Sequence, residues 1–221
     1  MRQYKLIIFD FDGTLADSGP WFMRTLNDVA SSHGFRKVSD EEIEMLRGRP
    51  NREIIRYLGV KMWQMPAIAR DMRRRSAEAA EGIKLFEGIP GLLRRLAGAG
   101  LQIGVVSSNS EPTVRSVLGE AASSVGHYSC GASLFGKASK FISLRRRLNL
   151  RPDEVLAVGD EGRDVEAAKK AGFDAVAVTW GYATEEALQA CAPTFLARSV
   201  DDLAAICLGA APEGQSLRMS S

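Results

Sequence analysis

The sequence predicts an α/β protein whose core is a doubly wound parallel sheet, with a helical segment inserted after its first strand. Two observations support the sheet. Apolar runs rich in β-forming residues recur along the chain, and most are continuously apolar, which is typical of strands covered by helices on both faces. From about Leu85 onward these runs alternate with helical patterns, the order expected of a parallel sheet. The predicted strands are Leu6 to Phe9, Gln102 to Val106, Val155 to Val158 and Ala175 to Val178.

Four helical patterns accompany the strands after Leu85. Glycines stand where two of them should stop, Gly98 and Gly100 after the first and Gly172 after the last. A proline suits the first turn of the second, and the third has apolar residues at helical spacing. The predicted helices are Pro90 to Leu96, Pro112 to about Leu118, Lys137 to Leu148 and Asp164 to Ala171.

The third observation concerns the stretch from Ala16 to about Glu81, which contains helical patterns and no convincing strand. A capping box at Ser39-Asp40-Glu41-Glu42 opens one helix. Arg47-Gly48-Arg49-Pro50 breaks that helix, and a further helix runs from Asn51 to Leu58. We expect the apolar residues just beyond to pack in the core of this insertion: Met62, Trp63 and Met65.

These patterns divide the chain into three parts. We expect residues 1–15 and 82–208 to form the α/β core domain and residues 16–81 to form a helical domain. Residues 209–221 are rich in Gly, Pro and Ser and should form a flexible C-terminal tail.

Net charge, cysteine content and the length of apolar runs indicate which binding partners and which cellular compartment to expect. The chain has 221 residues, 45% of them hydrophobic and 25% charged, and its net charge of +2 is too small to predict binding to nucleic acid or to a membrane surface. Three scattered cysteines without a CxxC pair indicate free thiols in a reducing compartment. The run from Leu6 to Phe9 is too short for a signal peptide, and no run reaches transmembrane length. We therefore expect a cytoplasmic protein, either a monomer or a homodimer.

Acidic side chains follow the first and third of the predicted strands. Asp10 and Asp12 follow the first, and Asp160 follows the third, with Asp164 one helical turn beyond. A hydroxyl and amide group follows the second strand: Ser107, Ser108 and Asn109. One aspartate at a strand end usually forms a turn or caps a helix, but ligands of parallel sheets bind beyond the carboxyl ends of the strands. Clustered carboxylates require a cation, and oxygen ligands suit Mg²⁺.

These residues stand in four ordered motifs: "DFDGTLADS" from Asp10, "VVSSN" from Val105, Lys137, and "GDEGRD" from Gly159. Together they resemble the motifs of the haloacid dehalogenase-like (HAD) phosphohydrolase superfamily, and most closely its phosphoglycolate-phosphatase-like subgroup. The resemblance implies a Rossmann-like core domain and a mobile helical cap, the latter in the place of residues 16–81.

The resemblance also implies a role for each site residue. Asp10 would be the nucleophile that forms an aspartyl-phosphate, and Asp12 the general acid and base. Mg²⁺ would be held by the Asp10 carboxylate, the Asp12 backbone carbonyl and Asp160, with Asp164 holding a metal-bound water or the lysine. Ser107 would bind the phosphoryl group, helped by backbone amides near Ser108 and Asn109.

Two assignments leave alternatives open. Lys137 fits the place of the family's lysine better than Lys140, although many relatives have a proline after this lysine and here Ala138 and Ser139 follow. Asp164 matches the spacing of the last acid better than Glu161 does.

The helix break at "RGRPNRE" supplies the candidate contacts of the cap with substrate. The resemblance implies that this break faces the site, and Arg49 is the best candidate to bind a substrate carboxylate or second phosphate. Arg47, Asn51 and Arg52 are weaker candidates, and the loop could equally be a solvated basic surface.

The leading functional interpretation is a Mg²⁺-dependent phosphatase that acts on a small phosphorylated, phosphoglycolate-like metabolite. A dehalogenase is disfavoured because that chemistry lacks the acid present here as Asp12. A phosphonatase would need a reactive cap lysine, and neither Lys37 nor Lys61 lies in a special setting. A sugar-phosphate mutase uses the same aspartyl-phosphate and stays open. A non-catalytic binding protein on this fold should have lost these acids, yet all are present.

Overall fold

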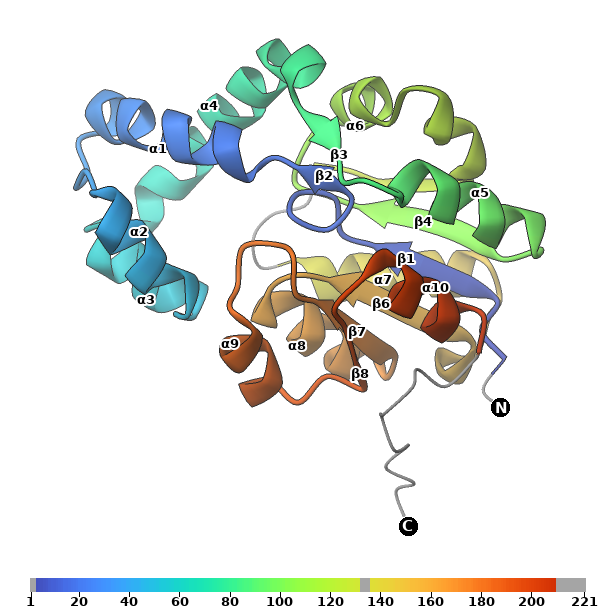
Figure 1. Ribbon diagram of the computed structural model, residues 1–221. Helices are drawn as coiled ribbons and strands as arrows, with labels where there is room; N and C mark the ends of the chain where they lie inside the picture. The colour runs from blue at the N-terminus through green and yellow to red at the C-terminus, as the bar shows by residue number, and fades with distance from the viewer. Residues whose placement is uncertain (1–2, 132–135, 210–221) are drawn as a thin grey trace.

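The computed structural model describes residues 3–131 and 136–209, and its centre is a six-stranded parallel sheet with strand order β5-β4-β1-β6-β7-β8 (Figure 1). All neighbouring strands in this sheet run parallel. The sheet confirms the predicted fold class. Its strands are β1 (Leu6–Phe9), β4 (Gln102–Val106), β5 (His127–Ser129), β6 (Val155–Gly159), β7 (Asp174–Val178) and β8 (Phe195–Ala197).

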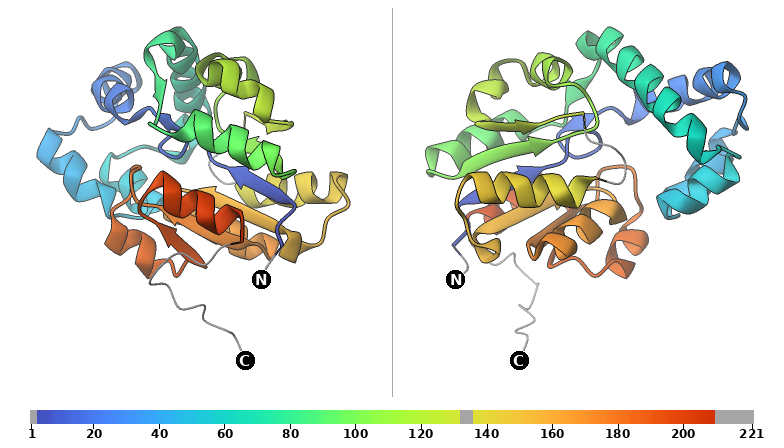
Figure 2. Two further views of the ribbon diagram at one scale, coloured as in Figure 1. Left: turned by 45° about the vertical axis from the view of Figure 1, so that its right-hand side comes forward. Right: turned by 180° about the vertical axis from the view of Figure 1, so that it is seen from behind.

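Helices cover both faces of the sheet, as Figure 2 shows from two sides. Side chains of β1 alternate between the faces, so Ile7 and Phe9 belong to one buried cluster while Leu6 and Ile8 belong to the other. On the side of Ile7 and Phe9 lie α5 (Ile89–Gly98), α6 (Glu111–Leu118) and α10 (Val200–Cys207). On the opposite side lie α7 (Lys137–Arg147), α8 (Gly162–Ala171) and α9 (Glu185–Ala190).

Strand register aligns the carboxyl ends of the three central strands. Phe9 of β1 pairs with Val105 of β4 on one side and with Val158 of β6 on the other. The residues that follow therefore reach the same edge of the sheet, and these include Asp10 and Asp160.

The predicted strands agree with the structure in place and nearly in length. β1 and β4 have the predicted bounds, whereas β6 extends to Gly159 and β7 begins at Asp174. The two outermost strands, β5 and β8, were not predicted. Each has only three residues, which is short for a strand. The β5 sequence His-Tyr-Ser is half-buried and contains no continuous apolar run that could have marked it.

The insertion after β1 is helical, as predicted. Its helices are α1 (Gly19–His33), α2 (Asp40–Arg47), α3 (Asn51–Tyr57) and α4 (Met65–Glu78), and Figure 1 shows them grouped beyond one end of the sheet. The capping box at Ser39 and Glu42 is present, and the break between α2 and α3 falls at Gly48 to Pro50. Two short 3₁₀ helices, η1 (Met62–Gln64) and η2 (Ala80–Gly82), flank α4.

A small antiparallel ribbon joins the insertion to the core. It pairs β2 (Ala16–Asp17), where the chain leaves the sheet, with β3 (Lys84–Leu85), where the chain returns. We propose this ribbon as the junction between a core domain of residues 1–15 and 82–208 and a cap of residues 16–81. The predicted tail, residues 209–221, lies outside the described residues apart from Gly209.

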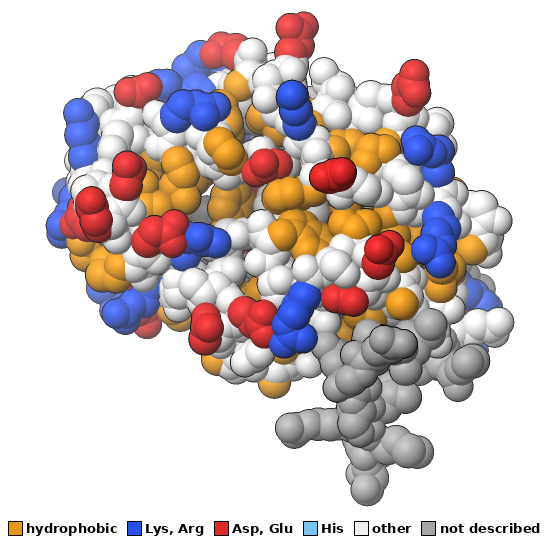
Figure 3. Space-filling model, in the orientation of Figure 1, with side chains coloured by type: hydrophobic (Ala, Val, Ile, Leu, Met, Phe, Trp, Pro, Cys, Tyr) orange, Lys and Arg blue, Asp and Glu red, His pale blue; other side chains and the backbone are white. Residues whose placement is uncertain are grey.

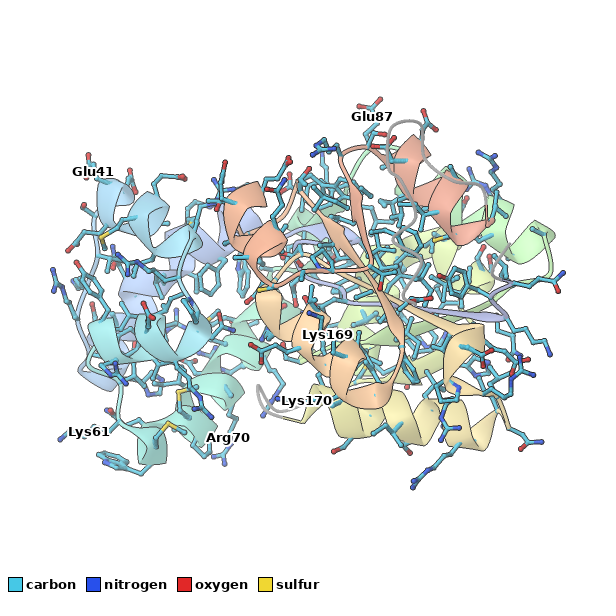
Figure 4. The ribbon with its side chains drawn as sticks, turned by 90° about the horizontal axis from the view of Figure 1, so that it is seen from below. Glu41, Lys61, Arg70, Glu87, Lys169 and Lys170 are labelled. Carbon is cyan, nitrogen blue, oxygen red and sulfur yellow. The ribbon has the colours of Figure 1, made fainter. Side chains whose placement is uncertain are left out.

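The expectation that Met62 and Trp63 pack inside the insertion was wrong, since their exposed fractions are 61% and 75%. The buried cluster is instead built by other side chains of the insertion, with Val38, Ile43, Leu46 and Leu58 at its centre. The apolar residues of η1 led to the prediction that this segment is buried, but Met62 and Trp63 lie on the surface of the insertion. Figure 4 shows the neighbouring Lys61 projecting outward there.

Within residues 3–131 and 136–209, no helix combines the length and apolar character that a membrane crossing requires. On the face seen in Figure 3, basic and acidic side chains are interspersed.

Candidate active site

Three buried aspartates meet at the carboxyl edge of the sheet. Asp10 follows β1, Asp160 follows β6, and Asp164 lies in the first turn of α8. One carboxylate oxygen from each lies within 4.8 Å of the other two. An all-carboxylate donor set suits a hard cation such as Mg²⁺, so these residues fit the expected metal.

Burial and mutual repulsion disfavour the ionised forms of two of these aspartates, Asp10 and Asp160. Burial is the largest effect on Asp10 and raises its pKa to about 6, although the charge of Lys137 pulls the other way. Burial also raises the pKa of Asp160 well above its usual range, and the negative charges of Glu161, Asp164 and Asp10 add to that rise. A cation held among these groups would relieve both effects.

Lys137 lies inside the cluster. Its Nζ is 2.7 Å from Oδ2 of Asp10 and 2.5 Å from Oδ1 of Asp164, and the first turn of α7 places it there. Burial alone would lower the pKa of this lysine, but the two carboxylates outweigh burial and the net shift is upward. Lys140, one turn later, donates instead to the backbone carbonyl of Cys130 at 2.7 Å. Of the two candidates, the structure brings Lys137 to the aspartates.

Asp164 is fixed by its helix and by close packing. Its Oδ2 accepts a hydrogen bond from the backbone N–H of Glu161 at 3.0 Å. A Cβ at Gly159 would lie 2.3 Å from Cβ of Asp164, so only glycine fits against this side chain. The alternative acid, Glu161, is engaged with Arg163, whose Nη2 lies 2.6 Å from Oε1.

Asp12 lies at the edge of the cluster and is half-buried. One of its oxygens, Oδ2, accepts a hydrogen bond from Nδ2 of Asn109 at 2.9 Å. Burial raises the pKa of Asp12, against the opposing effects of a hydrogen bond from Ser18 and of nearby positive charges. A raised pKa suits a carboxyl group that gives and takes protons near neutral pH.

The loop after β4 positions Ser107 and Asn109, both of which are buried. Oγ of Ser107 accepts a hydrogen bond from the backbone N–H of Asn109 at 3.0 Å. The Ser107 hydroxyl hydrogen can therefore point toward a ligand. The Asn109 backbone N–H, expected to help bind a ligand, is engaged with Ser107 here, and the Asn109 side chain contacts Asp12. Ser108, between them, is half-buried.

Sequence reasoning missed the groups that hold Asp160. Oγ1 of Thr14 donates to its Oδ1 at 2.8 Å, and the backbone N–H of Tyr182 donates to its Oδ2 at 2.8 Å. Two glycines leave room for this arrangement. A Cβ at Gly13, where φ is +73°, would lie 2.2 Å from Oδ2 of Asp160, and one at Gly181 would lie 2.3 Å from Cβ of Asp160. Thr14 stands within the opening motif, whereas no motif marked Tyr182.

The helix break in the insertion places its arginines differently. The side chain of Arg49 is 55% exposed and hydrogen-bonds Glu53 at 3.3 Å within the insertion. Arg47 reaches the core instead, where Nε donates to the carbonyl of Tyr182 at 2.8 Å and Nη2 to that of Gly181 at 3.2 Å. The other candidates at this break are Asn51, half-buried, and Arg52, exposed.

Comparison with known proteins identifies the family to which the chain belongs. A phosphoglycolate phosphatase from Synechococcus elongatus is 34% identical over 201 residues, which cover 90% of this chain and 95% of that protein. The tyrosine-protein kinase PtkA from Mycobacterium tuberculosis is 31% identical over 207 residues, 90% of this chain and 71% of that protein. The structure of SP0104, a haloacid dehalogenase-like hydrolase from Streptococcus pneumoniae, superposes with a TM-score of 0.77 at 20% identity, covering 93% of this chain and 99% of that one. The sequence profile of the haloacid dehalogenase-like hydrolases matches residues 7–178, and the chain therefore belongs to this enzyme family.

Proposed function

We propose that this protein is a Mg²⁺-dependent phosphatase that hydrolyses a small phosphorylated metabolite, a phosphomonoester resembling phosphoglycolate. The observation that carries the proposal is the position of Lys137, whose ammonium group lies between the buried carboxylates of Asp10 and Asp164. A cation here can neutralise both a nucleophilic carboxylate and an incoming phosphoryl group. The name of the Synechococcus relative supports the choice of substrate class.

In the first step, a carboxylate oxygen of Asp10 attacks phosphorus and forms an aspartyl-phosphate. The bond between phosphorus and the ester oxygen breaks, and protonated Asp12 gives its proton to that oxygen as the alcohol leaves. The raised pKa of Asp12 favours the protonated form that this step requires.

In the second step, water attacks the phosphorus of the aspartyl-phosphate. Asp12, now ionised, accepts a proton from the water, and the bond between phosphorus and the Asp10 oxygen breaks. Inorganic phosphate leaves and Asp10 is regenerated as a carboxylate. Asn109 would hold Asp12 in place through both steps.

The phosphoryl group needs partners for its remaining oxygens. Lys137 would offset their charge, the hydroxyl of Ser107 would donate a hydrogen bond, and Ser108 and Asn109 would line the loop beside it. The metal would be held by Asp10, by the backbone carbonyl of Asp12 and by Asp160, with Asp164 adjacent. Bound there, Mg²⁺ would supply positive charge that shields the attacking carboxylate from the anionic phosphate.

Arg49 would recognise the part of the substrate that leaves. Its side chain lies at the break between α2 and α3 and is exposed. To bind a substrate carboxylate it would exchange its contact with Glu53 for a charge-assisted hydrogen bond.

A panel of phosphorylated metabolites tests the proposal. Phosphorus NMR should show inorganic phosphate released from a small phosphomonoester in the presence of Mg²⁺, and the Asp10→Asn variant should release none. Formation of an isomeric phosphate ester without release would indicate a mutase. Absence of turnover by a folded, Mg²⁺-binding protein would indicate a binding protein. Transfer of phosphate from ATP to tyrosine would indicate the activity for which the Mycobacterium relative is named.

A further inference from the structure

Tyr182 lies in the turn between β7 and α9 and uses four different groups to contact its surroundings. Its backbone N–H donates to Oδ2 of Asp160, and its hydroxyl is hydrogen-bonded to Oγ of Ser18, both at 2.8 Å. Its carbonyl accepts from Nε of Arg47 at 2.8 Å, and the centre of its ring lies 5.8 Å from that of Phe22. One residue therefore contacts both the carboxylate cluster and the inserted helices.

The inserted helices rest on this turn through three of those contacts. Arg47 is the last residue of α2, Ser18 directly precedes α1, and Phe22 lies in the first turn of α1. The view from below in Figure 4 shows α9 beside the inserted helices. Contact with the turn thus involves both α1 and α2.

The hydroxyl of Tyr182 also leads toward Asp12. Ser18 also lies near enough to Asp12 for hydrogen bonding by its hydroxyl to oppose the rise in the pKa of that carboxyl group. Ser18 has a single hydroxyl hydrogen, and an ionised carboxylate can only accept. When Asp12 is ionised, Tyr182 is therefore the donor to Ser18, and the hydrogen bonds run from Tyr182 through Ser18 to Asp12.

We propose that Tyr182 is a positioning residue that makes the placement of Asp12 and Asp160 depend on the contact between the inserted helices and the β7–α9 turn. The proposal rests on the proposed phosphatase function for the role of Asp12, and on the structure alone for the link to Asp160.

Close packing makes this link stiff. A Cβ at Gly181 would lie 2.3 Å from Cβ of Asp160, and one at Gly13 would lie 2.8 Å from Cδ2 of Tyr182. The turn is therefore closely packed against both Asp160 and the loop after β1. A shift of the Tyr182 backbone that follows loss of the Arg47 contact must move its N–H relative to Asp160.

The first test removes only the hydroxyl of Tyr182. In Tyr182→Phe, kcat/KM for an alkyl ester such as phosphoglycolate should fall roughly tenfold, because Asp12 is no longer held in position to protonate the leaving oxygen. With p-nitrophenyl phosphate, whose leaving group needs little protonation, kcat/KM should fall by less than about threefold. A purely structural role would lower both equally, and that result would overturn the link to Asp12.

Tyr4→Phe is the matched control for this variant. Tyr4 is buried, and its hydroxyl also donates to a carboxylate, Oδ2 of Asp174, at 2.8 Å. Asp174 begins β7, so this hydrogen bond lies at the opposite end of the sheet from the carboxylate cluster. Its loss should leave the ratio of the two kcat/KM values unchanged.

The second test needs no turnover. Arg47→Ala removes the donors to the Tyr182 and Gly181 carbonyls, so hydrogen exchange of metal-free protein should become faster at α2 and at the β7–α9 turn. The Mg²⁺ dissociation constant from calorimetry should rise roughly tenfold, as for loss of other groups that orient metal ligands. Arg74→Ala, which removes an exposed arginine paired with Asp71 and Glu78, should change neither.

Unchanged exchange at the turn together with unchanged Mg²⁺ affinity in Arg47→Ala would overturn the link to Asp160. If the wild type binds Mg²⁺ but hydrolyses no phosphoester, the phosphatase proposal fails, and the Arg47→Ala measurements still decide this one.

Discussion

The side-chain nitrogen of Lys137 lies 2.7 Å from Oδ2 of Asp10, and both residues are buried. A lysine in this position does more than balance charge in the free protein. Because Nζ also lies 2.5 Å from Asp164, it is held from two sides and cannot turn freely toward solvent. A phosphoryl group that approaches Asp10 would therefore meet a positive charge already in place, the condition under which electrostatic stabilisation is most effective.

Exchanging each lysine of α7 for methionine tests this interpretation. Methionine keeps much of the packing of the lysine stem and removes its charge. We expect Lys137→Met to lower kcat at least about a hundredfold, the range typical for loss of a preorganised charge, and Lys140→Met to stay close to wild type. Steady-state kinetics on both variants decides the assignment, and the reverse ranking would move the cation one helical turn along α7.

Neutralising Asp10 should change how the stability of metal-free protein depends on pH. Its pKa rises from 3.8 to about 6 on folding, so the folded state binds this proton more tightly than the unfolded state does. The free energy of unfolding should therefore increase as pH falls from 7.5 to 5, by about 1.4 kcal/mol from this group, because pH 5 lies roughly one unit below the folded pKa. Asp10→Asn should lack that increase and should be the more stable protein at pH 7.5.

Urea denaturation of both proteins across this pH range measures the difference directly. Comparing the two proteins removes the contributions of titratable groups far from Asp10, which both share. Added Mg²⁺ should stabilise wild type more than the variant at pH 7.5. Parallel pH profiles for the two proteins would contradict the assigned shift of Asp10.

Asp12→Asn should separate proton transfer from metal binding. An amide cannot give or take the proton, so kcat should fall roughly a hundredfold or more. The backbone carbonyl of residue 12 remains as an oxygen ligand, so the Mg²⁺ dissociation constant should change much less than kcat does. Calorimetry gives the Mg²⁺ dissociation constant and steady-state kinetics gives kcat, both measured on the same preparation. Lost Mg²⁺ binding with normal turnover at saturating metal would refute the proposed role.

Thr14→Val tests whether Asp160 needs its hydroxyl partner. Valine has nearly the same shape, so the change removes mainly the hydrogen bond from Oγ1 to Oδ1 of Asp160. Loss of a group that orients a metal ligand typically weakens binding by about 10- to 100-fold, and we expect Mg²⁺ affinity to fall within this range. Thr113→Val is the control. It removes a buried hydroxyl in α6 that is hydrogen-bonded to Ser110, the residue before that helix, and it should leave Mg²⁺ affinity unchanged.

The sequence predicted the sheet edge better than the details of the site. Strand ends at Phe9 and Val106 were correct because covered strands leave continuous apolar runs. The structure brings Asp10, Asp160 and Asp164 together because parallel strands end at one edge, which follows from topology alone.

Contacts that depend on the direction of a side chain could not be predicted in this way. Arg47 and Arg49 are two residues apart at a helix end, and the turn of the chain decides which one faces the core. Tyr182 is separated from Ser18 by 164 residues, and their hydrogen bond depends on how the β7–α9 turn folds back. Trp63 was likewise mispredicted, because its apolar character alone does not determine whether the side chain faces the interior or the solvent.

Arg49→Ala tests whether the inserted helices recognise the leaving group. A generic aryl phosphate presents only the phosphoryl group, which Lys137 and Ser107 of the core would hold, so its kcat/KM should change little. A substrate with a carboxylate would lose a charge-assisted hydrogen bond worth about 1.5–3 kcal/mol, which corresponds to a loss of roughly ten- to hundredfold in kcat/KM. Arg74→Ala is the control for loss of charge from the inserted helices, because Arg74 is an exposed residue of α4 that forms ion pairs with Asp71 and Glu78. Kinetics with both substrates on all three proteins gives the answer. Equal losses on the two substrates would assign Arg49 a structural role through Glu53, and no loss on either would leave Arg49 an exposed residue of the helix break.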